Sequence, residues 1–123
     1  MPTYANGKIC YIELPAADIA QSSSFYANVA AWEMRTRGDG SLAFTDTANE
    51  VSGTFVKGRA PSKGGLIVYI MVDDIDASCA KVLANGGAIT VPVDRSAREC
   101  FAHFTDPAGN ELGFYQAGGN VTT

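Results

Sequence analysis

The sequence predicts an α+β fold built from two βαβββ modules, and an internal repeat is the main observation behind it. Residues 45–53 align without a gap with residues 105–113, and Thr, Asp, Ala and Gly recur at the first, second, fourth and last positions. A second alignment pairs the extended run before Asp18 with the extended run before Asp74. Each aspartate precedes apolar residues at helical spacing. A chain of 123 residues is therefore expected to form one domain, 1–123, of two pseudo-symmetric modules.

The first module is expected over residues 8–57. Residues 8–14 alternate as a strand does, and Asp18 with Gln21 three residues later is typical of a helix start. The apolar spacing that follows predicts a helix ending near Ala31. Residues 32–36 and 41–45 predict two strands joined by a hairpin turn at 38–40, and residues 52–57 predict a fourth strand. Residues 58–65, with a proline and three glycines, predict the linker between modules.

The second module is expected over residues 66–116. Residues 66–72 predict its first strand, and three aspartates at 73, 74 and 76 favour a helix start. Its helix should bury a stripe of Ile75, Cys79, Val82 and Leu83 and should stop at Gly86 and Gly87. Residues 88–91, 100–105 and 111–116 predict the remaining strands. Each helix carries one narrow apolar stripe, so each is expected to cover one face of a sheet and to leave the other face open.

The charge and composition exclude several classes of partner. The net charge is −4 and no basic cluster occurs, which argues against nucleic acid and anionic membrane surfaces. The apolar runs are too short to cross a bilayer, and no basic-then-apolar signal opens the chain. Three cysteines stand at no metal-ligand spacing, which favours free thiols in a reducing cytoplasm. We therefore expect a cytoplasmic protein with a small-molecule partner.

Two motifs add a family resemblance to this pattern. The opening ELPAADIAQSSSFY (residues 13–26) and the close DPAGNELGFYQ (residues 106–116) resemble the vicinal oxygen chelate superfamily, which includes glyoxalase I, extradiol dioxygenases, fosfomycin-resistance enzymes and bleomycin-binding proteins. The resemblance spans residues 8–116. It implies two modules that curl into a U-shaped, partly open mixed β-barrel with one helix per module outside, usually within a homodimer. Fold alone does not give function.

The resemblance also implies four strand positions that hold a divalent ion in the metal-dependent members, through His, Gln or Glu. Here those positions map to Tyr11, Gly53, Ile67 and Gly113. A hard divalent ion needs carboxylate or imidazole donors, which these residues do not supply. The sequence therefore predicts that the metal site is lost and that the protein uses no metal or other cofactor.

Strand alternation from the same positions predicts the lining of the cleft. It should be a mostly aromatic and apolar trough, suited to a small planar molecule. Two glycines in it would let a flat ligand lie close to the sheet. The residues expected to face inward are Tyr11, Glu13, Ser41, Ala43, Gly53, Phe55, Ile67, Tyr69, Met71, Phe101, His103, Thr105, Gly113 and Tyr115. Glu111 is assigned to a solvated turn, and Asp106 is expected to cap its own turn.

Three functions remain open at this point. The first is a metal-free protein that binds or sequesters a planar aromatic molecule. The second is a metal-independent isomerase, epimerase or lyase in which Glu13 acts as general base and His103 or Tyr11 polarises a carbonyl. The third is a dimeric module whose trough is filled by side chains. The missing chelate and the aromatic lining favour binding.

Overall fold

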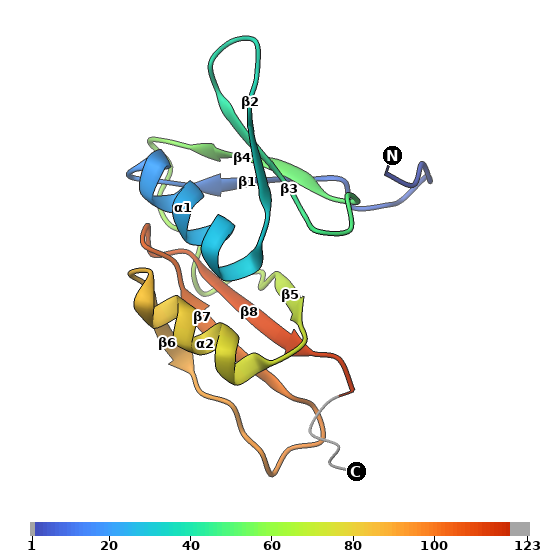
Figure 1. The fold of residues 1–123 in the computed structure, drawn as a ribbon, viewed down its shortest axis with the longest axis vertical. Coiled ribbons are helices and arrows are strands. Elements are labelled where there is room, and N and C mark those ends of the chain that lie inside the picture. The colour runs from blue at the N-terminus through green and yellow to red at the C-terminus, as the bar shows by residue number, and fades with distance from the viewer. Residues whose placement is uncertain (1, 119–123) are drawn as a thin grey trace.

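The computed structural model describes residues 2–118, which form two four-stranded mixed sheets, each with one helix against one face (Figure 1). The first module contains β1 (Tyr11–Pro15), α1 (Ile19–Ala30), β2 (Glu33–Thr36), β3 (Leu42–Thr45) and β4 (Ser52–Val56). The second contains β5 (Tyr69–Val72), α2 (Ile75–Ala84), β6 (Ala88–Val91), β7 (Phe101–Thr105) and β8 (Glu111–Gln116). The α+β class and the two βαβββ modules are confirmed. Residues 119–123, the end of the predicted domain, lie outside the described residues.

The two sheets have the same topology. The strand orders are β1-β4-β3-β2 and β5-β8-β7-β6, with the first pair of each sheet parallel and the others antiparallel. Within residues 2–118 no strand of one sheet pairs with a strand of the other, so the sheets stay open. Figure 1 shows the modules one above the other, with α1 and α2 on the same side of the molecule.

The helices begin where the sequence predicts. Asp18 and Asp74 are the N-caps, and Oδ1 of each accepts a 3.1 Å hydrogen bond from the backbone N–H three residues later. The first helix ends on Ala31, which has a φ of 58° although it is not glycine. The second ends before Gly86, whose φ of 92° is the conformation that glycine adopts at helix ends. Neither helix of the described chain is long and apolar enough to cross a membrane.

The predicted stripe of α2 is wrong at one position. Leu83 is exposed and Cys79 is half-buried against the core, and the buried residues of the helix are Ile75, Ser78 and Val82. Val82 lies seven residues after Ile75, nearly two full turns, whereas Leu83 is rotated about 100° further round the helix. Ser78 is buried because it lies on the helix face between Ile75 and Val82.

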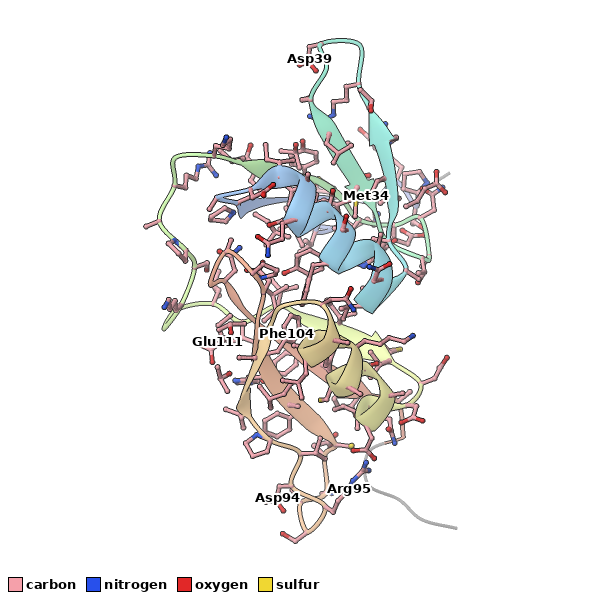
Figure 2. The ribbon with its side chains drawn as sticks, turned by 60° about the vertical axis from the view of Figure 1, so that its left-hand side comes forward. Met34, Asp39, Asp94, Arg95, Phe104 and Glu111 are labelled. Atoms are coloured by element: carbon pink, nitrogen blue, oxygen red, sulfur yellow. The ribbon has the colours of Figure 1, made fainter. Side chains whose placement is uncertain are left out.

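One hydrophobic core extends through both modules. In the first, Trp32 is stacked between Tyr26 and Phe44, with ring centroids 4.7 and 4.6 Å apart. Phe25 of α1 reaches Phe104 of β7 at 6.0 Å between ring centroids, which joins the two halves of the core. Figure 2 shows Phe104 in the interior of the molecule, whereas Asp39 and the pair Asp94 and Arg95 mark its two far ends. The open faces of the sheets lie away from this core.

Candidate functional site

The open face of the second sheet carries a trough of about 440 Å³, within the range of small-molecule sites. Its position follows from strand register, because Met71 and Phe101 both pair with Tyr115 and therefore share its face. Glu99, just before β7, contributes a carboxylate to an otherwise apolar lining. The structure thus brings together four residues that the sequence places in the cleft: Tyr69, Met71, Phe101 and Tyr115.

Three rings form a cluster beside the trough. Tyr69 and Phe101 meet edge to face at 6.2 Å between centroids, and His103 lies 5.5 Å from Tyr69 and 5.7 Å from Phe101. The edge-to-face contact places the positive edge of one ring against the negative face of the other, which favours this orientation of Tyr69 and Phe101. The trough therefore has one preordered aromatic wall.

Gly113 makes this wall possible. It pairs with Tyr69 on one side and with His103 on the other. A Cβ at Gly113 would lie 2.6 Å from Cδ1 and Cε1 of Tyr69, closer than real contacts allow. The glycine thus leaves room for the tyrosine ring to lie across the sheet. The sequence predicts that a ligand would occupy this space, whereas the structure fills it with Tyr69.

His103 has two partners. Its Nε2 lies 2.7 Å from the Tyr69 hydroxyl, and its Nδ1 lies 3.8 Å from Oε2 of Glu111. Figure 2 shows Glu111 on the side of the second sheet away from α2. The sequence assigns Glu111 to a solvated turn, but it is the first residue of β8. The same alternation that turns Gly113 inward turns Glu111 inward two residues earlier, so this signal was available in the sequence.

Glu99 is the second charged group that the sequence prediction does not include. The Tyr115 hydroxyl donates a 2.7 Å hydrogen bond to its Oε2, and this bond, with the adjacent negative charge, raises the pKa of Tyr115. Tyr115 therefore keeps its proton over a wider range of pH. Glu99 lies in the loop before β7, where neither helical nor strand periodicity indicates a direction for its side chain.

The first sheet presents a polar open face. Tyr11 and Glu13 are both exposed there, the hydroxyl of Tyr11 bonded to Arg37 and the carboxylate of Glu13 2.8 Å from Nη1 of Arg59. Glu13 and His103 thus belong to different sheets, and among the described residues no hydrogen bond or ion pair joins them. Ile67 precedes β5 and is half-buried.

The predicted facing of Gly53 and Phe55 is wrong. Both pair with core residues of β1, and a Cβ at Gly53 would lie 2.1 Å from the Ile12 carbonyl oxygen and 2.2 Å from the Phe44 ring. The turn between β3 and β4 has one residue more than its counterpart: residues 46–51 separate Thr45 from its partner, but residues 106–110 separate the corresponding pair of the second module. A shift of one residue reverses the face of every side chain after it.

With the corrected register, the counterpart of Gly113 is Thr54, which pairs with Glu13 and lies on the open face. Its hydroxyl donates a 2.7 Å hydrogen bond to the Leu42 carbonyl. With Thr54 in place of Gly53, the four positions to which the family resemblance assigns metal ligands carry a tyrosine, a threonine, an isoleucine and a glycine, and none of these side chains offers a carboxylate or an imidazole. Among residues 2–118, no three His, Cys, Asp or Glu side chains gather as a metal would require.

Comparison with known proteins identifies the family to which the fold belongs. The family model of the Glyoxalase/Bleomycin resistance protein/Dioxygenase superfamily matches residues 8–114. CFP32 of Mycobacterium tuberculosis is 28% identical over 96% of this chain, and the chain spans 49% of the length of CFP32. A glyoxylase-like domain-containing protein of Didymella fabae is 30% identical over 67% of this chain and 70% of that protein.

Solved structures share the fold at low identity. TnmS3, an antibiotic binding protein from Streptomyces sp. CB03234, superposes with a TM-score of 0.70 at 21% identity, over 93% of this chain and 98% of that one. A glyoxalase/bleomycin resistance protein/dioxygenase family enzyme from Burkholderia phytofirmans PsJN gives 0.71 at 18% identity, over 86% and 95% of the two chains. At these identities the structures establish the fold only.

Proposed function

This chain belongs to the Glyoxalase/Bleomycin resistance protein/Dioxygenase superfamily, and we propose that within it the protein binds a small planar aromatic molecule without a metal ion. The observation that carries the proposal is the trough of about 440 Å³ lined by Tyr69, Met71, Phe101 and Tyr115, with Glu99 as its one carboxylate. Flat aromatic ligands gain contact area and ring stacking in such a site. A protein of the same fold is named for antibiotic binding, which supports this use of the fold.

The proposal is tested by calorimetric titration with planar ligands built on naphthalene, coumarin and anthraquinone, each compared with its saturated-ring counterpart. We expect the planar compounds to bind and the saturated ones to bind several-fold more weakly. Phe101→Ala should weaken planar ligands by about three- to tenfold, the size of one lost ring contact. Tyr4→Ala, which changes a fully exposed tyrosine, is the matched control. Equal affinity for planar and saturated rings would overturn the proposal.

We infer further that two copies of the chain associate. In the described part of the chain, β1 and β5 are edge strands with one strand neighbour each. The residues before them include Ile9 and Leu66, whose exposed fractions are 74% and 91%. A groove of about 730 Å³ runs between the modules and is lined in part by Val68 and Ile70 beside this edge. Unprotected edges with apolar residues favour pairing with a second chain, which supports a homodimer.

A further inference from the structure

A chain of three polar groups crosses the open face of the second sheet. The hydroxyl of Tyr69 in β5 contacts Nε2 of His103 in β7 at 2.7 Å, and Nδ1 of His103 lies 3.8 Å from Oε2 of Glu111 in β8. Thr90 of β6 donates a 3.0 Å hydrogen bond to the same Glu111 oxygen. All four strands of the sheet thus contribute to this arrangement.

One end of this series of polar groups is shielded from solvent, and the other end is open to the trough. The side chains of His103 and Glu111 are 18% and 21% exposed, whereas Tyr69 is 47% exposed and lines the trough. Gly113 allows Tyr69 to take this position, because a Cβ there would lie 2.6 Å from the ring. The tyrosine is therefore the member of the chain that a bound molecule can reach.

The partners of His103 favour one tautomer of its neutral ring. The Glu111 carboxylate only accepts, so a proton on Nδ1, the nitrogen that faces it at 3.8 Å, is the favourable arrangement and leaves Nε2 to accept one. The Tyr69 hydroxyl then donates to Nε2, and its oxygen can accept a hydrogen bond from a molecule in the trough. A second proton on the ring would place an imidazolium 3.8 Å from the Glu111 carboxylate, an ion pair in a half-buried site.

We propose that Tyr69, His103 and Glu111 form a proton relay that ionises a bound aromatic hydroxyl, so that the trough prefers planar phenols and enols. This inference rests on the proposed binding function. In the step, the ligand O–H bond breaks and its proton passes to the Tyr69 oxygen, while the Tyr69 proton passes to Nε2 of His103. The products are a ligand oxyanion and an imidazolium beside Glu111, and no oxidant or co-reactant is needed.

The surrounding charges define how the ligand lies. Glu99 and Tyr115 are the other titratable groups that line the trough, and Glu99 is four residues before His103 along the chain. The proposal places the oxyanion at the Tyr69 hydroxyl, because the Glu99 carboxylate would repel it elsewhere in the trough. An aliphatic alcohol is too weakly acidic to give its proton to an imidazole, whereas a phenol conjugated to a carbonyl or fused ring is acidic enough.

The test uses 7-hydroxycoumarin and its methyl ether, 7-methoxycoumarin, as a matched pair. The neutral and ionised forms of the hydroxy compound absorb at different wavelengths, so absorbance against pH reports its ionisation when free and when bound. We expect the midpoint of ionisation of the bound compound to fall by about one pH unit, a tenfold change. His103→Gln and Glu111→Gln should remove this shift, and Glu111→Gln, whose side chain lies outside the trough lining, should still bind the methyl ether. Glu33→Gln, an exposed carboxylate of β2, controls for the change in net charge.

The outcomes separate the two proposals. If both coumarins bind and the hydroxyl ionises at the same pH as in solution, the relay is overturned and the binding function stands. If the shift survives in His103→Gln, the relay is likewise overturned. If neither coumarin binds, nor the corresponding pair of 2-naphthol and 2-methoxynaphthalene, the binding function itself fails and the relay with it.

Discussion

The hydroxyl of Tyr26 in α1 donates a 2.8 Å hydrogen bond to Oδ2 of Asp106, eighty residues away in the turn between β7 and β8. Both residues are buried. The other carboxylate oxygen of Asp106 accepts from the backbone N–H groups of Ala108 and Asn110, which confirms that Asp106 caps its own turn. The Asn110 amide donates to Oδ2 of Asp106 and also to the Pro15 carbonyl at 2.7 Å. The turn motif is thus also the polar joint between the modules.

Tyr26→Phe should therefore lower the free energy of unfolding. The substitution removes one donor from a buried carboxylate, which costs about 1–3 kcal/mol because the acceptor is charged. The measurement is urea unfolding followed by circular dichroism. Tyr4→Phe removes the hydroxyl of a fully exposed tyrosine and should leave the midpoint unchanged. Equal unfolding midpoints for the two variants would show that the hydrogen bond between Tyr26 and Asp106 does not contribute to stability.

The same pair predicts how stability changes in alkali. Burial, and then the adjacent Asp106 charge, raise the pKa of Tyr26 well above its ordinary value of 10.0. The folded protein thus keeps a proton that the unfolded chain releases, so stability is full below pH 10 and falls as the pH rises above it. The contribution of one such group is about 1.4 kcal/mol per pH unit. Between pH 10 and 11, unfolding of the wild type should depend on pH more steeply than that of Tyr26→Phe; parallel curves would contradict this.

Much of the fold can be predicted from the sequence, because the helix-cap and strand-alternation signals are local and agree with the structure. Caps at Asp18 and Asp74, and alternation in the strands, place every helix and strand to within about three residues. The end of α1 near Ala31 is predicted as well, although Ala31 takes a positive φ that is more usual for glycine. The Tyr26–Asp106 contact has no local signal, because it depends on how α1 packs against a turn of the other module.

The sequence predicts which side chains of the candidate site share a face of the sheet only where the strand register follows from residues close together in the sequence. In the second module, alternation correctly turns Tyr69, Met71, Phe101 and Tyr115 to one face. In the first module the prediction fails at Gly53, because the gapless alignment of the repeat crosses a turn that has one extra residue. The repeat preserves residue types through this turn but does not preserve register, and only strand pairing reveals the difference.

Gly53→Ala tests the corrected register. Because the added Cβ would lie 2.1 Å from a backbone oxygen and 2.2 Å from the Phe44 ring, we expect a loss of about 1–3 kcal/mol or more in the free energy of unfolding. Gly38→Ala is the control, because a Cβ at Gly38 has no atom within 4 Å and its φ is not positive. If Gly53 faced the open side of the sheet, both substitutions would be tolerated. Thermal unfolding of the two variants distinguishes these cases.

The metal content of the purified protein tests the prediction that the metal site is lost. Because Tyr11, Thr54, Ile67 and Gly113 lack carboxylate and imidazole donors, the purified protein should retain far less than one ion per chain after exposure to Zn, Ni, Mn or Fe(II), followed by desalting. Mass spectrometry gives the content, and treatment with a chelator should leave the melting temperature unchanged. Retention of close to one ion per chain would contradict the assignment. His103→Ala and Glu111→Ala would then identify the ligands, because these two side chains lie 3.8 Å apart on one open face.

The inferred homodimer should respond to charge at the edge strands. Ile9→Lys and Leu66→Lys place a cation beside β1 and β5, where burial against a second chain would leave it unpaired. Both variants should sediment as monomers at concentrations at which the wild type is dimeric. Leu83→Lys, which changes an exposed leucine of α2, should remain dimeric. If only Leu83→Lys dissociates the dimer, the interface lies on the helices instead. If the wild type is a monomer at all concentrations, the inference of a homodimer is wrong.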